Sequence, residues 1–503
     1  MRLRKVAAVG VAAALVAGAL GFSPPDLVSA DQERSDRRCE RNNNSVRKLL
    51  ECITVAGVLR HEEAFQEIAD DNDGTRVSGT PGYDESVDYV ARTMRRAGYR
   101  VTIQEFEFLL FRILGPSELD QTAPGQATYT EGTDFAPTPQ SDSGEVGAAV
   151  TAVDLQLGLG NTSTSGCEPA DYDNFPAGNI ALIQRGTCTF EQKAETAAAE
   201  GAVGVIFFNQ GNTAAPDRNG IPAVTLGNTN TSGIPAVSTT YALGVQLSET
   251  PGLRMHMFVN VDRRVAETYN VIADSKRHRE DDNVIMAGAH LDSVAEGPGI
   301  QDNGSGSSAL LETALQMAKT KTENPTRFAW WGAEESGLVG STFYVNDLVA
   351  NDPEGLENIE LYLNFDMIAS PNYGLFIYDG DGDGFGLVGP DGSDDIEAVF
   401  ERYYAERGIP SEPTAFSGRS DYQAFINNGI PAGGLFTGAE GIKTAAQQAK
   451  WGGTAGIAYD PCYHQACDDI DNLSLRALDI NSDAVAYAMF NYATGRDELN
   501  TGG

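Results

Sequence analysis

The chain has 503 residues, of which 41% are hydrophobic, so it is long enough for two or three domains with proper cores. Its formal charge of −36 and isoelectric point near 4.4 exclude a nucleic-acid-binding surface, which needs clustered Lys and Arg. An acidic surface mainly promotes solubility, and it also favours hard cations such as calcium.

Residues 1–30 have the pattern of a secretory signal peptide. Three basic residues stand at the start, an apolar segment follows at 6–22, and small residues at 28–30 supply a cleavage site. An apolar run of about 17 residues with small side chains is short for a membrane span. We therefore expect a secreted, extracellular protein that does not bind membranes. Removing the peptide leaves a mature charge of 32 minus 70, or −38.

The six cysteines fall as three pairs that are close in sequence. An exported chain folds in an oxidising compartment, so we expect disulfides. The alternative, a zinc–thiolate site, has no Cys-x-x-Cys motif to support it. Six cysteines allow 15 pairings. Proximity in sequence favours Cys39 with Cys52, Cys167 with Cys188, and Cys462 with Cys467.

The predicted mature chain begins with a polar segment at 31–50, which we interpret as a propeptide or a loose N-terminal arm. The first part of the main domain is expected at 51–108. Within it, the hydrophobic pattern predicts helices around 61–69 and at 86–97. Alternating apolar and polar residues predict a strand over 101–108.

The composition changes between 109 and 268, where Gly, Thr, Pro and Asn are frequent and the expected strands are short. Two of these strands, at 179–184 and 203–208, flank an Ala-rich helix at 190–200. The segment contains one histidine, His256, and its sequence shows no cluster of histidine with acids. We therefore expect an inserted, non-catalytic domain without a metal site.

Strands and helices alternate through the second part of the main domain, 269–495, before a short tail at 496–503. Three apolar strands and two helices are expected in alternation, at 283–289, 307–321, 327–331, 341–350 and 360–365. This order predicts an α/β fold with a mixed, mainly parallel sheet and helices on both faces. The insert is expected to be a β-rich α+β domain.

Histidine and acidic residues stand where the three strands end. His290 follows the first strand, Glu334 and Glu335 follow the second, and Asp366 follows the third. Because functional groups gather at the carboxyl ends of parallel strands, we expect these side chains to meet at one edge of the sheet. Asp302, in a Gly-rich loop before a helix, can reach the same place.

Taken singly, each of these residues has a structural explanation. A lone histidine at a strand end is more often packed than ligating, and acids in pairs or before Asn-Gly commonly form turns. Their coincidence at successive strand ends favours a metal centre. Asp292, two residues after His290, is a candidate to accept a hydrogen bond from the imidazole and fix its tautomer.

Five motifs occur in a fixed order along the main domain. They are MAGAHLDS at 286–293, DNGSG at 302–306, FAWWGAEE at 328–335, YLNFDM at 362–367, and CYH at 462–464 with Cys467 following. Together they resemble the secreted bacterial dizinc leucine aminopeptidases, which are aminopeptidase Y-like zinc exopeptidases. The likeness spans 55–110 and 268–495 and leaves the insert outside it.

The insert carries a resemblance of its own. Its segments GNIALIQRGTCTF at 178–190 and IPAVS at 234–238 are similar to the protease-associated domain. This resemblance implies a domain that covers or shapes an active-site entrance and does no chemistry itself.

The resemblance of the main domain implies a complete site with two zinc ions. His290 and Asp366 would bind one ion, Glu335 and His464 the other, and Asp302 would bridge both. A water shared by two such ions becomes a hydroxide near neutral pH and attacks the scissile carbonyl.

The same resemblance implies roles for neighbouring residues. Glu334 would be the general base that passes the proton of the water to the leaving amine. Tyr463 would donate to the developing oxyanion, with a packed tyrosine beside a disulfide as the alternative. Arg419 and Phe436 match substrate-binding positions; Phe436 would line a pocket for large apolar residues such as Leu, and Arg419 could instead be a surface ion-pair partner. Tyr422 stands where relatives can carry His.

Two segments raise the question of calcium. Asp479 and Asp483, at i and i+4 of an expected helix, match a calcium position of the family, but Cys52 stands where the family carries a further carboxylate. The segment 379–384 has the spaced aspartates that open an EF-hand loop, but Pro390 stands in place of its bidentate glutamate. We favour a flexible acidic loop for this segment.

The sequence therefore predicts a secreted, monomeric dizinc aminopeptidase whose partners are peptides with a free N-terminus. A carboxypeptidase-type or cyclase-type zinc enzyme on the same scaffold is the first alternative. The scarcity of Lys and Arg around the motifs argues against a site for a terminal carboxylate. A catalytically inactive binding protein is the second alternative, and it would be expected to lack ligands that this chain has.

Overall fold

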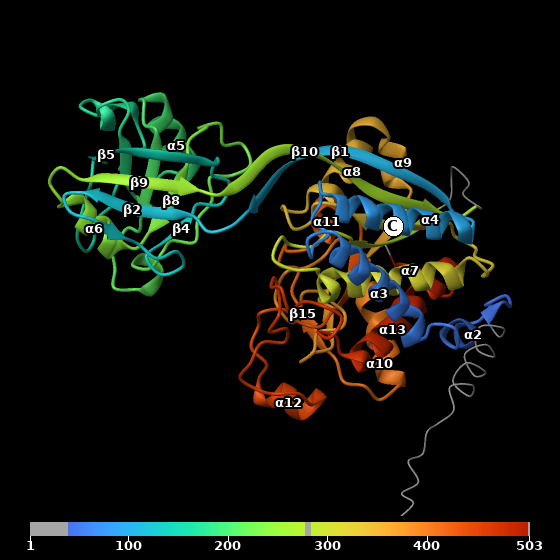
Figure 1. Cartoon of the computed structure of the whole chain (residues 1–503). Coiled ribbons are helices and arrows are strands. Elements are labelled where there is room, and N and C mark those ends of the chain that lie inside the picture. Colours follow the sequence, from blue (N-terminus) through green and yellow to red (C-terminus); the bar gives the residue numbers. More distant parts are fainter. Residues whose placement is uncertain (1–38, 277–282, 501–503) are drawn as a thin grey trace, which may run out of the picture.

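A computed structural model describes residues 39–276 and 283–500, and the predicted signal peptide lies outside them. Two lobes are visible in Figure 1, each built on an eight-stranded sheet. The long strands β1 (Arg100–Ile113) and β10 (Val261–Asp274) join them. Among the described residues, no helix combines the length and the apolar character needed to cross a membrane.

The main lobe contains a mixed sheet. Its four central strands run parallel to one another and are β12 (Thr326–Trp331), β11 (Val284–His290), β13 (Ile359–Phe365) and β16 (Ala432–Phe436). The antiparallel strands β1 and β10 extend one edge, and the short strands β14 (Phe376–Tyr378) and β15 (Glu412–Thr414) extend the other. The order is β1-β10-β12-β11-β13-β16-β14-β15. The predicted mixed, mainly parallel sheet is confirmed.

Helices cover both faces of this sheet. The first face carries α3 (Val55–Asp71), α4 (Pro81–Ala97), α7 (Ser305–Met317), α10 (Ser393–Glu406) and α13 (Leu475–Ala493). The second face carries α8 (Val339–Asn351) and α11 (Tyr422–Asn427). Three further short helices are α2 (Val46–Leu50), α9 (Pro353–Glu357) and α12 (Ala445–Trp451); Leu49 of α2 and Trp451 of α12 join the core on the first face.

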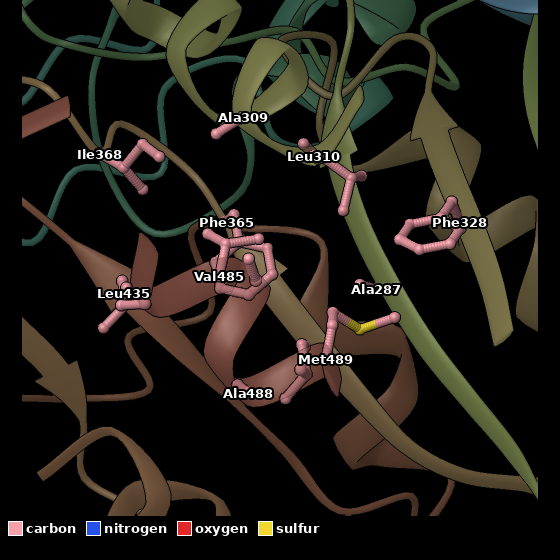
Figure 2. Close-up of a cluster of buried hydrophobic side chains, with 14 of the residues drawn as sticks. Ala287, Ala309, Leu310, Phe328, Phe365, Ile368, Leu435, Val485, Ala488 and Met489 are labelled. Carbon is pink, nitrogen blue, oxygen red and sulfur yellow. The ribbon is translucent and has the colours of Figure 1, made fainter. Parts of the chain in front are cut away.

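The sequence of each central strand explains why both faces are covered. Successive side chains of a strand point to opposite faces, so a strand that is apolar throughout needs a partner on each side. In β13, Leu361 and Leu363 pack with the first group of helices and Tyr362 with the second. Figure 2 shows part of the first core, where Phe365 of β13 and Met489 of α13 lie between sheet and helix.

The second lobe is the insert. Its sheet has the order β3-β2-β9-β5-β6-β7-β8-β4, with strands at Ala127–Thr128, Glu118–Ala123, Arg254–Val259, Gly144–Val153, Ile180–Gln184, Gly204–Phe208, Ala236–Thr239 and Phe135–Pro137 respectively. Two helices, α5 (Phe190–Ala199) and α6 (Tyr241–Ser248), pack on opposite faces of this sheet. The predicted β-rich α+β architecture is confirmed.

The predicted elements are present, with differences at their ends. The helix expected over 307–321 stops at Met317, because the polar run that follows contains two threonines and offers no apolar face. The boundaries expected for the insert, near 108 and 268, fall inside β1 and β10. These strands pair along their whole length, with Arg100 opposite Asp274 and Ile113 opposite Val261.

The three predicted disulfides are present: Cys39–Cys52, Cys167–Cys188 and Cys462–Cys467. The first fastens the N-terminal segment expected to be loose. Within that segment Leu49 is fully buried, and Asn43 donates to the carbonyl oxygen of Gln316 at 3.2 Å. The described residues of the segment therefore belong to the packed main lobe.

Candidate metal centre

The parallel register of the central strands brings the predicted residues to one edge of the sheet. His290 is the last residue of β11 and is paired in register with Trp331, the last residue of β12. Ala333 then adopts a left-handed conformation, with φ of 53°, and the chain turns into Glu334. A single cavity is lined by all five predicted ligands and by Glu334, Arg419, Phe436, Tyr422 and Tyr463.

Asp302 reaches this edge from the loop between β11 and α7. Asp468 holds the loop, because its carboxylate accepts hydrogen bonds from the amides of Gln301 at 2.9 Å and Asp302 at 3.0 Å. The second glycine of the DNGSG motif is required sterically, because a Cβ at Gly306 would lie 2.1 Å from the carbonyl oxygen of Phe365. Only glycine lets the start of α7 approach the end of β13 this closely.

Asp302 lies between the two histidines. Its Oδ1 is 3.2 Å from His290 Nε2, and its Oδ2 is 3.3 Å from His464 Nε2. Asp366 Oδ1 lies 3.3 Å from the same His290 nitrogen, and Glu335 Oε2 lies 3.1 Å from the His464 nitrogen. In each group of three residues the potential ligand atoms lie within 4.8 Å of one another. Two groups thus share one carboxylate.

Metal ions account for the arrangement of these two groups better than hydrogen bonds within the groups do. Glu335 Oε1 is buried and has no hydrogen-bond partner, which is a costly state for a carboxylate oxygen. Among the described residues, Asp302, Glu335 and Asp366 form ion pairs with histidines only, so no Lys or Arg offsets their charge. Imidazole nitrogens and carboxylate oxygens are the ligand atoms that zinc binds in proteins, and the excess negative charge of the three carboxylates favours a cation.

Glu334 lies beside the two groups. Its side chain is buried, and its Oε2 is 3.9 Å from His290 Nε2. Burial raises the pKa of Glu334 well above its usual range; His290 offsets part of this effect and the neighbouring Glu335 adds to it. A buried carboxylate with a raised pKa in a cleft is suited to accept and return a proton.

Asp292 lies next to His290 but does more than the sequence indicated. Its backbone oxygen is 3.1 Å from His290 Nδ1, whereas its carboxylate oxygen Oδ1 is 3.7 Å away. The carboxylate instead accepts hydrogen bonds from the amides of Glu334 at 3.2 Å and Glu335 at 3.4 Å. Asp292 therefore supports the turn that carries both glutamates.

The predicted substrate-binding residues both line the cavity. Arg419 donates to Glu440 at 2.8 Å and to the Tyr463 hydroxyl at 3.1 Å. The Tyr463 ring stacks on His464, with ring centroids 3.8 Å apart. Burial raises the pKa of Tyr463, which keeps the phenol protonated. Phe436, the last residue of β16, lines the same cavity.

Three supporting residues were not predicted from the sequence. Ser420, next to Arg419, donates to Asp366 Oδ2 at 2.6 Å. Asp468 caps the Asp302 loop, as described above. Arg76 is fully buried, and its guanidinium donates to the carbonyl oxygens of three residues in that loop, namely Pro298 at 2.9 Å, Gly299 at 2.7 Å and Leu291. None has a local sequence signal, because each acts on a distant segment.

The candidate calcium positions lie outside the cavity. Asp479 and Asp483 are on α13, and Asp483 Oδ1 is buried without a hydrogen-bond partner. The spaced aspartates at 379–384 behave differently. Asp379 accepts from the amides of Gly382 at 3.0 Å and Phe385 at 2.8 Å, so its oxygens are satisfied by its own loop.

One expectation is wrong. The insert was expected to hold no cluster of histidine with acids, but His256 lies beside Glu118 and Asp120, with potential ligand atoms within 4.8 Å of one another. The acids come from a strand more than a hundred residues earlier, which explains why the local sequence does not reveal them.

Comparison with known proteins agrees with this geometry. The profile of peptidase family M28 matches residues 270–489, and that of the PA domain matches 148–247. An aminopeptidase of Pseudomonas aeruginosa is 56% identical over 439 residues, which are 87% of this chain and 81% of that protein. The chain belongs to peptidase family M28. The predictions of an aminopeptidase and of an inserted protease-associated domain are confirmed.

Other M28 relatives extend the comparison. A probable leucine aminopeptidase 2 of Trichophyton verrucosum is 38% identical over 447 residues, covering 88% of this chain and 84% of the relative. The solved aminopeptidase of Aneurinibacillus sp. strain AM-1 is 26% identical, with a TM-score of 0.66 over 91% of this chain and 98% of that one. A zinc aminopeptidase of Bacillus subtilis, 23% identical with a TM-score of 0.59 over 89% and 98% of the chains, has the same fold.

Proposed function

We propose that this M28 enzyme is a secreted, monomeric dizinc aminopeptidase that removes large hydrophobic residues from the N-terminus of peptides. The observation that carries the proposal is the position of Asp302, whose two oxygens face two different histidines at 3.2 and 3.3 Å. His290, Asp302 and Asp366 would hold one ion, and Asp302, Glu335 and His464 the other.

Two zinc ions bound in these groups would lower the pKa of a shared water and polarise the scissile carbonyl. Glu334, buried beside both groups with its Oε2 3.9 Å from His290 Nε2, would take a proton from the attacking water and deliver it to the leaving amine. Asp292 fixes the backbone of Glu334 through the amide hydrogen bond. Tyr463, held protonated beside His464, donates to the oxygen on which negative charge develops.

The residues that line the cavity also support cleavage at the N-terminus of a peptide. Its acidic lining suits the ammonium group of a free N-terminus, with Glu334 and Asp366 as neighbours of that group. Phe436 offers an apolar wall for the first side chain, in agreement with the name of the leucine aminopeptidase from T. verrucosum. Arg419 is the one Lys or Arg among the described lining residues, and it is already paired with Glu440. A carboxypeptidase, which must bind a terminal carboxylate, is therefore disfavoured, and two metal groups disfavour a one-zinc cyclase.

Blocking the substrate amine is expected to abolish hydrolysis. The enzyme should release the chromophore from a leucyl amide but not from its N-acetylated form, because acetylation removes the charge that the acidic lining recognises. A zinc chelator should abolish the first reaction, and added Zn²⁺ should restore it. Equal cleavage of both substrates would contradict an aminopeptidase, and activity after complete metal removal would contradict the zinc site.

Export is supported by the signal-peptide pattern of 1–30 and by the three disulfides. We expect the mature protein in the culture medium, with its first residue directly after Ala30. Retention of the full-length chain inside the cell would contradict secretion.

We further propose that Asp479 and Asp483 bind Ca²⁺. Burial and the charge of Asp479 raise the pKa of Asp483 to about 7. A raised folded-state pKa means that, without calcium, stability falls as the pH rises from about 4 to 7. At pH 8, Ca²⁺ is therefore expected to raise the Tm of the wild type and not that of Asp483→Asn. An equal shift in both proteins would rule out this site.

A further inference from the structure

A second group of charged side chains lies on the insert, in the other lobe from the metal centre (Figure 1). His256 is in β9, with Glu118 and Asp120 on the neighbouring strand β2 and Glu145 on β5 at its other side. Asp120 is directly opposite His256 in the antiparallel register. These four side chains share the outer face of the sheet, because Met255 and Met257, on either side of His256, are buried in the core.

The two nitrogens of the imidazole have different surroundings. Nε2 lies 3.0 Å from Glu145 Oε1, which is a hydrogen bond. Nδ1 lies 3.7 Å from Asp120 Oδ2 and 4.0 Å from Glu118 Oε2, and both distances are too long for hydrogen bonds. Two atoms that bind the same zinc ion at about 2.1 Å lie roughly 3.4–4 Å apart, depending on the angle between them. The Nδ1 side therefore has the spacing of a ligand set.

The charge balance of this face points the same way. Three carboxylates surround one imidazole, so even a protonated His256 leaves an excess of negative charge. Among the described residues, Glu118, Asp120 and Glu145 form ion pairs with His256 only. Glu118 and Asp120, two positions apart on β2, lie on the same face of the sheet, so their charges repel each other unless a cation offsets them.

We propose that His256 Nδ1, Asp120 and Glu118 form a further divalent-cation site on the protease-associated domain, one that takes a transition-metal ion such as Zn²⁺. A nitrogen ligand beside carboxylates favours zinc over calcium. Glu145 holds the other ring nitrogen, as acids behind ligating histidines commonly do, and so fixes the tautomer that leaves Nδ1 free to bind. Three protein ligands leave the remaining position to water. The ion ties β2 to β9 and does not depend on the function proposed for the main lobe.

Counting bound zinc tests this site in the full-length protein. Wild type, His256→Gln, Asp120→Asn and the control Glu249→Gln are dialysed against micromolar free Zn²⁺, and zinc per chain is measured by mass spectrometry. Glu249 is an exposed carboxylate of the same lobe outside the cluster. Both cluster variants are expected to hold one zinc fewer than the wild type, and the control the same number. Equal zinc in wild type and His256→Gln would overturn the proposal.

The test depends on the difference in zinc content between the wild type and each variant. A wrong assignment of the main-lobe centre would change the zinc content of all four proteins equally and leave the difference intact. Glu145→Gln is expected to weaken zinc binding at this site by about 10–100-fold, since it removes the acid behind the ligating histidine. A second readout is anomalous scattering at the zinc edge from a crystal of the wild type, with a peak expected between His256 and Asp120. Absence of the peak, or replacement of this zinc by equimolar Ca²⁺, would also overturn the proposal.

Discussion

Glu334→Gln is expected to lower kcat for a leucyl amide by about 10²–10⁴-fold, the usual contribution of a positioned general base. Glutamine keeps the size of the side chain, and the backbone amide still donates to Asp292. Only the ability to take and return a proton is lost. Bound zinc should be unchanged, because the proposed ligands are His290, Asp302, Glu335, Asp366 and His464.

A matched control is Glu354→Gln, the same substitution at an exposed position of α9. It should retain the kcat, KM and zinc content of the wild type. If Glu334→Gln kept more than a small fraction of wild-type kcat with its zinc in place, another group would have to be the base. A parallel loss of zinc would instead make Glu334 a ligand.

Arg76→Met is expected to lower the free energy of unfolding by about 3–5 kcal/mol, as removal of one partner from a buried charged network does. The guanidinium donates to three carbonyl oxygens of the loop that separates His290 from Asp302. It also faces the buried Glu62, whose pKa is raised well above its usual range by burial, with Arg76 lowering it. Without Arg76, the carbonyl oxygens lose their donors and Glu62 loses its nearby cation.

Urea unfolding of the zinc-loaded and zinc-free proteins measures this effect. The control is Arg92→Met, which removes an exposed arginine of α4 and should change stability by less than about 0.5 kcal/mol. Zinc affinity should also fall in Arg76→Met, since the loop that presents Asp302 is no longer held. Equal stability of the two variants would show that Arg76 does not hold the loop.

The sequence was most informative where local pattern and topology coincide. Apolar strands β11, β12 and β13 are recognisable from their composition, and their parallel order brings the residues after them to one edge. His290, Glu335 and Asp366 could therefore be predicted to meet. His464 could not be reached in this way, because it lies in an irregular loop closed by the disulfide Cys462–Cys467; only the resemblance to known aminopeptidases indicated it.

Residues that contact segments far away in the sequence could not be predicted. Arg76 supports a loop that begins 215 positions later in the chain, and Asp468 caps the amide of a residue 166 positions earlier. Such contacts depend on how helices and loops pack, and no spacing in the sequence encodes them. The group around His256 is similar: its acids become neighbours only through the register of β2, β9 and β5.

The way the insert is attached has a consequence for the main lobe. β1 enters the insert and β10 leaves it as paired strands, with Ile113 opposite Val261. Such cross-strand partners lie about 4.5–5.5 Å apart, the separation that a two-residue hairpin turn closes. To the main lobe the whole insert is therefore equivalent to the tip of a hairpin. A domain of another size at this point would leave the pairing of β1 with β10 and the order of the central strands unchanged, so the edge that carries the candidate metal centre does not depend on which domain is inserted.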